Sequence, residues 1–117
     1  PVECSWWSMR HRDFSELAGF DERFTSPGGG LVNHDFRDRA MALPGITPIV
    51  LLGEGVFHQF HGGVSTNARP TDRPIAQFHA EYESIHGTRY EPALAPPPHY
   101  FGTIPDAAQR FVSQQGR

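Results

Sequence analysis

The sequence predicts an α/β fold made of short elements joined by long loops. The 117 residues include 12 glycines and 11 prolines, about twice the usual share, which disfavours a helical bundle or a coiled coil. An apolar, β-branched run at 46–52 indicates a buried strand. Two or three strands are too few for a complete doubly wound sheet, so the chain is expected to be part of a larger fold. The clearest amphipathic helical pattern is formed by Ile75, Phe78, Tyr82 and Ile85.

The first half of the chain alternates short predicted elements with turns. Residues 3–9 are aromatic or small and favour a buried strand, and residues 13–17 favour one helical turn. The stretch TSPGGG at 25–30 predicts a loop that is flexible or pressed against a neighbour, because three glycines impose no backbone preference. A helix is expected over 34–43, with Asn33 as its N-cap and with Phe36, Ala40 and Leu43 on one apolar face.

The second half contains the clearest helix, which is predicted over 72–86 and closed by Gly87 at the C′ position. Before this helix, residues 56–60 are expected to be extended. After it, the proline-rich segment 88–102 is also expected to be extended. A last helix is predicted over 106–114.

Charge and cysteine content exclude several classes of protein. The formal net charge is -3 and the sequence pI is about 6.2, so the basic footprint of a nucleic-acid-binding protein is missing. The longest apolar stretch, 46–52, is too short to span a bilayer. Cys4 is the single cysteine, which rules out an internal disulfide and a cysteine-rich zinc site. We therefore expect a cytoplasmic protein without nucleic-acid partners and without a transmembrane segment.

Two histidines three residues apart, His58 and His61, lie in a glycine-flanked stretch and are candidate ligands of a divalent metal. On a regular strand this odd spacing points the two side chains to opposite faces. One of the two as a single ligand is therefore the easier geometry. The alternative is a histidine satisfied by backbone hydrogen bonds in a tight loop, and the residues alone favour that alternative.

Two further clusters combine acidic and polar side chains. Asp21 and Glu22 follow a Gly-Phe pair, while Asn33 and Asp35 stand at a predicted helix start with Arg39 one turn later. Such groups can face a hydroxyl-rich substrate beside the glycine loop. Capping and the helix dipole also explain Asn33 and Asp35, and a surface turn explains the other pair. The residues alone favour these structural roles.

Trp6 and Trp7 are adjacent in the predicted first strand. Successive strand residues point to opposite faces, so one indole can pack in the core while the other faces a cleft. A cleft-facing indole is a suitable platform for a sugar ring. Two core aromatic residues on a central strand are at least as compatible with this pattern.

The order of these clusters resembles the C-terminal half of a bacterial family 2 glycosyltransferase, a family with the Rossmann-like GT-A fold. The resemblance rests on CSWWSMRHRDFSELAGFDERF at 4–24, the triple glycine, the pattern N-x-D-x-x-x-R from Asn33, and GEGVFHQFHGGVSTN at 53–67. It covers about residues 3–67 and, more loosely, the remainder. The expected fold is therefore a partial GT-A domain, with a short mixed sheet and flanking helices.

The resemblance implies an enzyme that transfers a sugar from a nucleoside-diphosphate donor to a hydroxyl acceptor. It also implies that His58, or else His61, is a ligand of the Mn²⁺ or Mg²⁺ that holds the donor diphosphate. The candidate substrate-binding residues are then Trp6, Trp7, Asp21, Glu22, Gly28, Gly29, Gly30 and Arg39.

Two positions depart from the family pattern. Inverting members use the first Asp of ED-x-D as the general base, but Val32 and Asn33 stand at the first two of these positions and only Asp35 matches the second Asp. An amide cannot accept a proton from a hydroxyl group. The candidate catalytic residues are Asp35 and Asn33, with three alternatives: a retaining mechanism, Asp35 or Glu22 as the base, or Asn33 orienting a sugar hydroxyl.

The nucleotide-binding half of such an enzyme, with its Asp-x-Asp metal motif, has no counterpart in this sequence. The chain is therefore expected to be inactive alone, either as a fragment of a longer enzyme or because the other half lies on another polypeptide. Residues 1–67 would form the acceptor-side, metal-proximal part of the domain, and residues 68–117 a helical and proline-rich extension packed on it. An exposed sheet edge would favour association, including association of copies of this chain.

Two other functions remain open. A non-catalytic binding or assembly module derived from the GT-A fold is favoured by Val32 and Asn33. An unrelated histidine metal-binding protein would instead complete its site within the chain, with residues such as Asp35, Glu54, His79 or His86.

Overall fold

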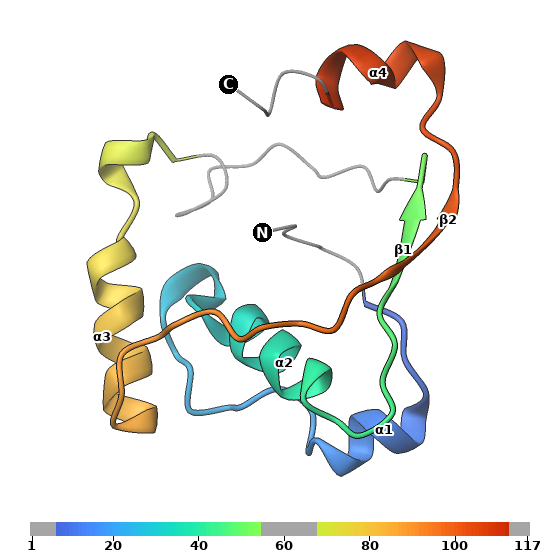
Figure 1. Ribbon diagram of the computed structural model, residues 1–117. Helices are drawn as coiled ribbons and strands as arrows, with labels where there is room; N and C mark the ends of the chain where they lie inside the picture. The colour runs from blue at the N-terminus through green and yellow to red at the C-terminus, as the bar shows by residue number, and fades with distance from the viewer. Residues whose placement is uncertain (1–6, 55–67, 113–117) are drawn as a thin grey trace.

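The computed structural model describes residues 7–54 and 68–112 (Figure 1). The described part is a small mixed α/β structure. Two short 3₁₀ helices, Pro27–Gly29 and Pro70–Asp72, accompany its main elements. These elements are the helices α1 (His11–Glu16), α2 (Val32–Met41), α3 (Ile75–His86) and α4 (Asp106–Val112), and the strands β1 (Ile49–Leu52) and β2 (His99–Gly102).

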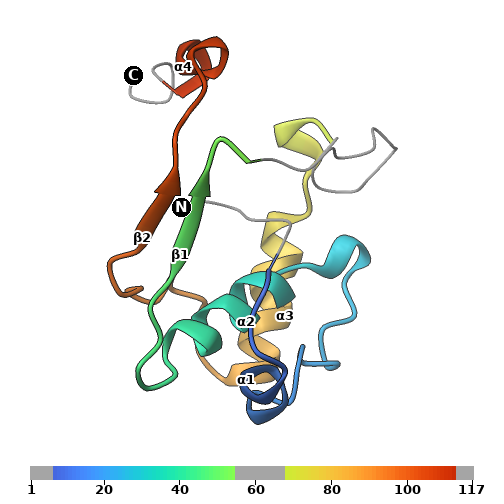
Figure 2. The ribbon, with the colours of Figure 1, turned by 90° about the vertical axis from the view of Figure 1, so that its right-hand side faces the viewer.

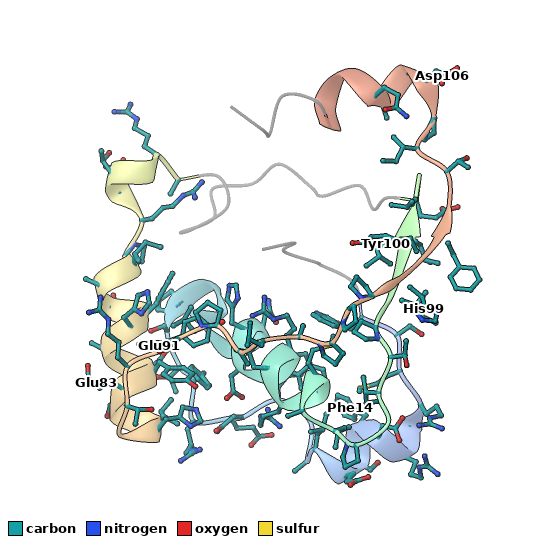
Figure 3. All side chains as sticks on the ribbon, in the orientation of Figure 1. Phe14, Glu83, Glu91, His99, Tyr100 and Asp106 are labelled. Carbon is teal, nitrogen blue, oxygen red and sulfur yellow. The ribbon has the colours of Figure 1, made fainter. Side chains whose placement is uncertain are left out.

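The sheet of the described residues has two strands, β1 and β2, which pair in parallel with Ile49 opposite His99 and Leu52 opposite Gly102. The sequence prediction of a buried strand over 46–52 is wrong in two respects. The strand begins only at Ile49, and Ile49 and Leu51 are 62% and 61% exposed. Parallel sheets are normally covered on both faces, whereas this one has an apolar side open to solvent. His99 and Tyr100 project to opposite sides of β2 (Figure 3).

α1 confirms the helical turn expected near 13–17, although it begins at His11 and ends at Glu16. Phe14 of α1 and Phe20, which follows the helix, pack against Phe36 of α2, with Phe20 and Phe36 centroids 4.5 Å apart. Phe36 is 1% exposed. Gly19, between the two phenylalanines, has φ +68°, and a Cβ there would lie 3.1 Å from the Phe14 ring. The turn after α1 therefore requires glycine.

α2 begins at Val32, and its N-cap is Leu31, so the prediction of Asn33 as N-cap is wrong. The backbone N–H of Asp35 already donates to the Leu31 carbonyl at 2.9 Å, which places Asn33 inside the first turn. Its side chain is exposed. The predicted apolar face is confirmed by the burial of Phe36 and Ala40.

α3 begins at Ile75 rather than at residue 72 because Arg73, before Pro74, is extended (φ −72°, ψ 129°). A residue preceding proline is disfavoured in the helical region. The C-terminal end agrees with the prediction: Gly87 has φ +71°, and its N–H donates to the Glu83 carbonyl at 2.8 Å. Phe78 is buried on the apolar face, whereas Ile75 at the start is exposed.

The proline-rich segment after α3 crosses beside α2 on its way to β2 (Figure 1). Asp38 of α2 holds this segment, since its carboxylate accepts from the Tyr90 hydroxyl and the Ala93 backbone N–H, both at 3.2 Å. Arg37 donates to Asp38 at 2.6 Å and to the Tyr90 oxygen at 3.2 Å. Burial, followed by the Asp38 charge, raises the pKa of Tyr90. The division of the chain into an acceptor-side part, 1–67, and an extension, 68–117, stays a prediction.

α4 lies beyond the carboxyl ends of both strands, at the opposite end of the molecule from α1 (Figure 2). It begins at Asp106, as predicted. Residues 7–9 form no strand, and the rest of the predicted strand 3–9 lies outside the described residues, as does 56–60. Among the described residues, none of the helices is long and apolar enough to cross a bilayer.

Candidate functional site

A pocket of about 390 Å³ opens where the turn after α1 meets α2 and the C-terminal end of α3. Its wall brings together polar and charged side chains from three separate stretches of the chain. The lining residues are Leu17, Ala18, Gly19, Phe20, Asp21, Glu22, Arg23, Arg39 and His86.

Arg39 fixes the shape of this pocket by holding the turn after α1 against α2. Its NH1 group donates to the Leu17 carbonyl at 2.7 Å, and NH2 donates to the Gly19 carbonyl at 2.9 Å. Its Nε donates to Asp35 Oδ2 at 2.9 Å, one helical turn earlier on α2. The i, i+4 spacing of the two residues puts them on one face of the helix. This local ion pair also positions Arg39 for its contacts with the turn after α1.

Asp35 is the buried anion of the site, with only 3% of its surface exposed. Its Oδ2 accepts the hydrogen bond from Arg39 Nε, and its Oδ1 lies 3.3 Å from Nε2 of His86. A buried charge is tolerated only when it is paired, and here the partners come from two different helices. Asp35 thus joins the end of α3 to α2.

Asp21 is held by Arg23 through several hydrogen bonds. The guanidinium Nε donates to both carboxylate oxygens, NH2 donates to Oδ2 at 2.6 Å, and the Arg23 backbone N–H donates to Oδ1 at 3.0 Å. These hydrogen bonds lower the pKa of Asp21 to about 2. Arg23 NH1 also reaches the Ile85 carbonyl at 3.3 Å, so the Asp21 turn is tied to α3.

His86, the last residue of α3, lies beside both carboxylates. Its ring stacks on Tyr82 at 4.4 Å between centroids, and its side chain is 25% exposed. Nε2 is fully buried and forms no well-aligned hydrogen bond, which leaves the 3.3 Å contact with Asp35 as an electrostatic one. Among the described residues, no hydrogen bond reaches Nδ1.

Asp21, Asp35 and His86 each offer one ligand atom, and these atoms lie within 4.8 Å of one another. This group does not suit a divalent cation, because Arg23 covers both oxygens of Asp21 and Arg39 covers Oδ2 of Asp35. A metal ion would have to displace two guanidinium groups. The cluster is better described as two carboxylates already paired with cations.

The glycine loop lies away from the wall of this pocket, against α3. Glu81 Oε1 accepts from the backbone N–H groups of Thr25 and Ser26, both at 2.7 Å. Burial raises the pKa of Glu81, but these hydrogen bonds outweigh it, and the net shift is downward. Gly30 has φ +53°, and a Cβ there would approach Glu81 Oε2 at 3.0 Å. The loop is pressed against a neighbour, one of the two alternatives that the sequence left open.

The structure gathers some of the predicted site residues and separates others. Asp21, Glu22 and Arg39 line the pocket, and Asp35 adjoins it. The other substrate-binding candidates, Gly28, Gly29 and Gly30, do not line it, and neither does the candidate catalytic residue Asn33. Trp7 is half-buried, with its indole Nε1 fully buried and unpaired. Trp6, His58 and His61 lie outside the described residues.

Three side chains that organise this region were missed by the sequence analysis: Arg23 and His86 of the pocket wall, and Glu81, which holds the glycine loop. His86 was considered only as a ligand of a metal site. Its position at the end of an amphipathic helix gives no local signal of Asp35, which is 51 residues earlier in the sequence. Arg23, two residues after Asp21, could have been recognised as its partner.

Acidification is expected to remove the stabilisation that the Asp21–Arg23 pair provides. The pKa of Asp21 in the folded chain is about 2, below the value near 3.9 of an unfolded chain, so the stabilisation is present above pH 4 and lost between about pH 4 and 2. Because the pair is near the surface, we expect about 1 kcal/mol. Urea unfolding of the wild type and Asp21→Asn at pH 6 and pH 2 measures it. A difference between the two proteins that persists at pH 2 would contradict this assignment.

No protein-family model, curated protein or solved structure matches this chain. The function is therefore inferred from the pocket and the sequence pattern together.

Proposed function

We propose that this chain is the acceptor-side part of a nucleotide-sugar-dependent glycosyltransferase and that its charged pocket holds the hydroxyl acceptor. The observation that carries the proposal is the meeting of Asp21, Glu22 and Arg39 in one wall, with Asp35 directly behind it. These are the positions at which the sequence resembles family 2 glycosyltransferases. Their convergence in one pocket supports the proposal.

The size and polarity of the pocket suit a sugar. Its volume of about 390 Å³ lies within the roughly 300–1,000 Å³ of small-molecule sites. Phe20 provides an apolar wall, and the exposed carboxylate of Glu22 can accept hydrogen bonds from sugar hydroxyls. Arg23 and Arg39 hold the charged turn in place, so the acceptor meets groups that are already ordered.

The donor would be bound largely by a nucleotide-binding half that this sequence lacks. A bound Mn²⁺ or Mg²⁺ would neutralise the leaving diphosphate, with His58 or His61 as the proposed protein ligand. The open side of the β1–β2 sheet, where Ile49, Leu51 and Phe101 are exposed, would be covered by that half or by a second copy of the chain. We place the enzyme in the cytoplasm, in line with its single cysteine.

A non-catalytic module derived from the same scaffold is the second candidate. It is favoured by Asn33, which occupies the position of the family's base and is exposed outside the pocket wall. Such a module would bind a sugar or a partner protein without transferring anything.

The substitution Glu22→Gln tests the proposed acceptor site. The complete enzyme, meaning this chain together with the nucleotide-binding half on the same or a second polypeptide, would be incubated with nucleoside-diphosphate sugars, Mn²⁺ and a panel of methyl glycosides, and the release of nucleoside diphosphate measured. We expect the KM for the acceptor to rise about tenfold in Glu22→Gln, because one charge-assisted hydrogen bond is lost. The matched control is Glu16→Gln, an exposed carboxylate of α1 outside the pocket wall, which should leave KM unchanged. If the wild type turns over none of these donors, the catalytic proposal fails and the non-catalytic module takes its place.

A further inference from the structure

The proposed transfer needs a group that accepts the proton of the acceptor hydroxyl. In a direct displacement, the hydroxyl oxygen bonds to the anomeric carbon, the bond from that carbon to the diphosphate oxygen breaks, and the diphosphate leaves with the electron pair. The hydroxyl proton must go to a base in the pocket. Asn33 cannot accept it, because an amide is not a base at neutral pH, and its side chain is not part of the pocket wall.

Asp21 is a poor choice for this base. Its carboxylate is bound on both oxygens by Arg23, and its pKa is about 2. A general base works best when its pKa lies near the working pH. The strongly paired Asp21 is therefore suited to orienting hydroxyl groups.

His86 has the properties that this base requires. It lines the pocket, its side chain is 25% exposed, and its ring is held in place by stacking on Tyr82. One ring nitrogen, Nε2, is buried and faces the Asp35 carboxylate at 3.3 Å. If that nitrogen carries the proton, the lone pair of Nδ1 is left to accept another.

Asp35 can orient this imidazole and stabilise its charged form. It is 3% exposed, and Arg39 fixes its other oxygen at 2.9 Å, so the carboxylate cannot turn away from His86. A buried carboxylate behind a histidine is a recurring device for selecting the tautomer and stabilising the imidazolium.

We propose that His86 is the general base of the transfer and that Asp35 is its positioning residue. This inference rests on the proposed glycosyltransferase function. It moves the base from the first turn of α2, where Asn33 stands, to the end of α3. The charged or titratable groups of the described residues that surround the His86 ring are Asp21, Glu22 and Arg23 of the turn, Asp35 and Arg39 of α2, and Tyr82 of α3.

The test is the pH profile of sugar transfer by the complete enzyme, with the nucleoside-diphosphate sugar and methyl glycoside that its wild type uses best. We expect His86→Gln to lower kcat by about 10²–10⁴-fold, with the KM for the donor unchanged, and to remove the acidic limb of the kcat profile. His79→Gln is the matched control, since it lies on the same helix but outside the pocket wall. It should leave both the rate and the limb unchanged.

The variant Asp35→Asn distinguishes a role of Asp35 in positioning His86 from a role in folding the chain. With the carboxylate gone, the imidazole loses the group that holds its orientation and tautomer, so kcat per folded molecule should fall while the KM for the donor stays unchanged. A merely structural role for Asp35 would lower the amount of folded enzyme without changing kcat per folded molecule. Nitrogen NMR of the His86 ring adds a readout that needs no activity, and we expect the proton on Nε2 at neutral pH.

Each contrary outcome identifies what has failed. If the wild type transfers sugar but Glu22→Gln, rather than His86→Gln, removes the acidic limb, Glu22 is the base and the His86 inference is wrong while the proposed function stands. A proton on Nδ1 in the NMR spectrum would also overturn the inference. If the wild type transfers no sugar, the proposed function has failed and the inference falls with it.

Discussion

Replacing Phe36 by alanine is expected to lower the free energy of unfolding by about 3–5 kcal/mol, the usual cost of removing a large aromatic side chain from a core. Among the described residues, Phe36 is the large side chain that is fully buried, and its ring packs on Phe14 and Phe20. The other buried apolar residues of the described part are Leu31, Ala40 and Phe78. A core this small cannot close around the cavity without loss.

Urea unfolding followed by tryptophan fluorescence measures this effect. The matched control is Phe101→Ala, since Phe101 of β2 is also a phenylalanine but is exposed on the sheet. It should cost well under 1 kcal/mol in the isolated chain, in line with other surface substitutions. If Phe101→Ala costs as much as Phe36→Ala, that side of the sheet is covered in solution, and the dependence of the cost on protein concentration would show whether a second copy covers it.

The contrast between these two phenylalanines shows what the sequence could and could not predict. Helical periodicity correctly predicted that Phe36 and Phe78 are buried, because both helices place these residues on faces that pack within the chain. The apolar run of β1 was expected to be buried for its composition alone. Burial of a strand depends on what lies on either side of it, and the described residues place nothing over Ile49 and Leu51.

In the candidate site, too, some contacts follow from the sequence and others do not. Arg39 and Asp35 are one helical turn apart, so their contact follows from spacing. The contacts of His86 with Asp35 and of Glu81 with Thr25 join residues more than 50 positions apart. They depend on how α3 is placed on α2 and on the glycine loop, and no local pattern encodes that placement. The Asn33 cap failed for a third reason, since the helix begins at Val32 after Leu31, which makes no side-chain capping hydrogen bond, although leucine is not a favoured N-cap residue.

Arg39→Met is expected to destabilise the chain by about 2–3 kcal/mol and to disorganise the pocket. The substitution keeps most of the apolar stem but leaves the buried Asp35 carboxylate with the His86 ring as its remaining close partner, and it takes a donor from the Leu17 and Gly19 carbonyls. Breaking one side of a buried pair costs about 3–5 kcal/mol. The value here is lower because the Arg39 side chain is 32% exposed.

A double-mutant cycle separates the lost ion pair from other effects of the substitution. Because the main cost is an unpaired buried charge, adding Asp35→Asn to Arg39→Met should recover part of the lost stability. Arg12→Met is the control, since Arg12 contacts the buried Asp13 at 3.3 Å but is itself largely exposed, and it should cost at most about 1 kcal/mol. Equal costs for the two arginine substitutions, or no recovery in the double variant, would mean that Arg39 is an ordinary surface residue. The turn that carries Asp21 and Glu22 would then need another anchor, and the acceptor pocket would lose the preorganisation on which its proposed role depends.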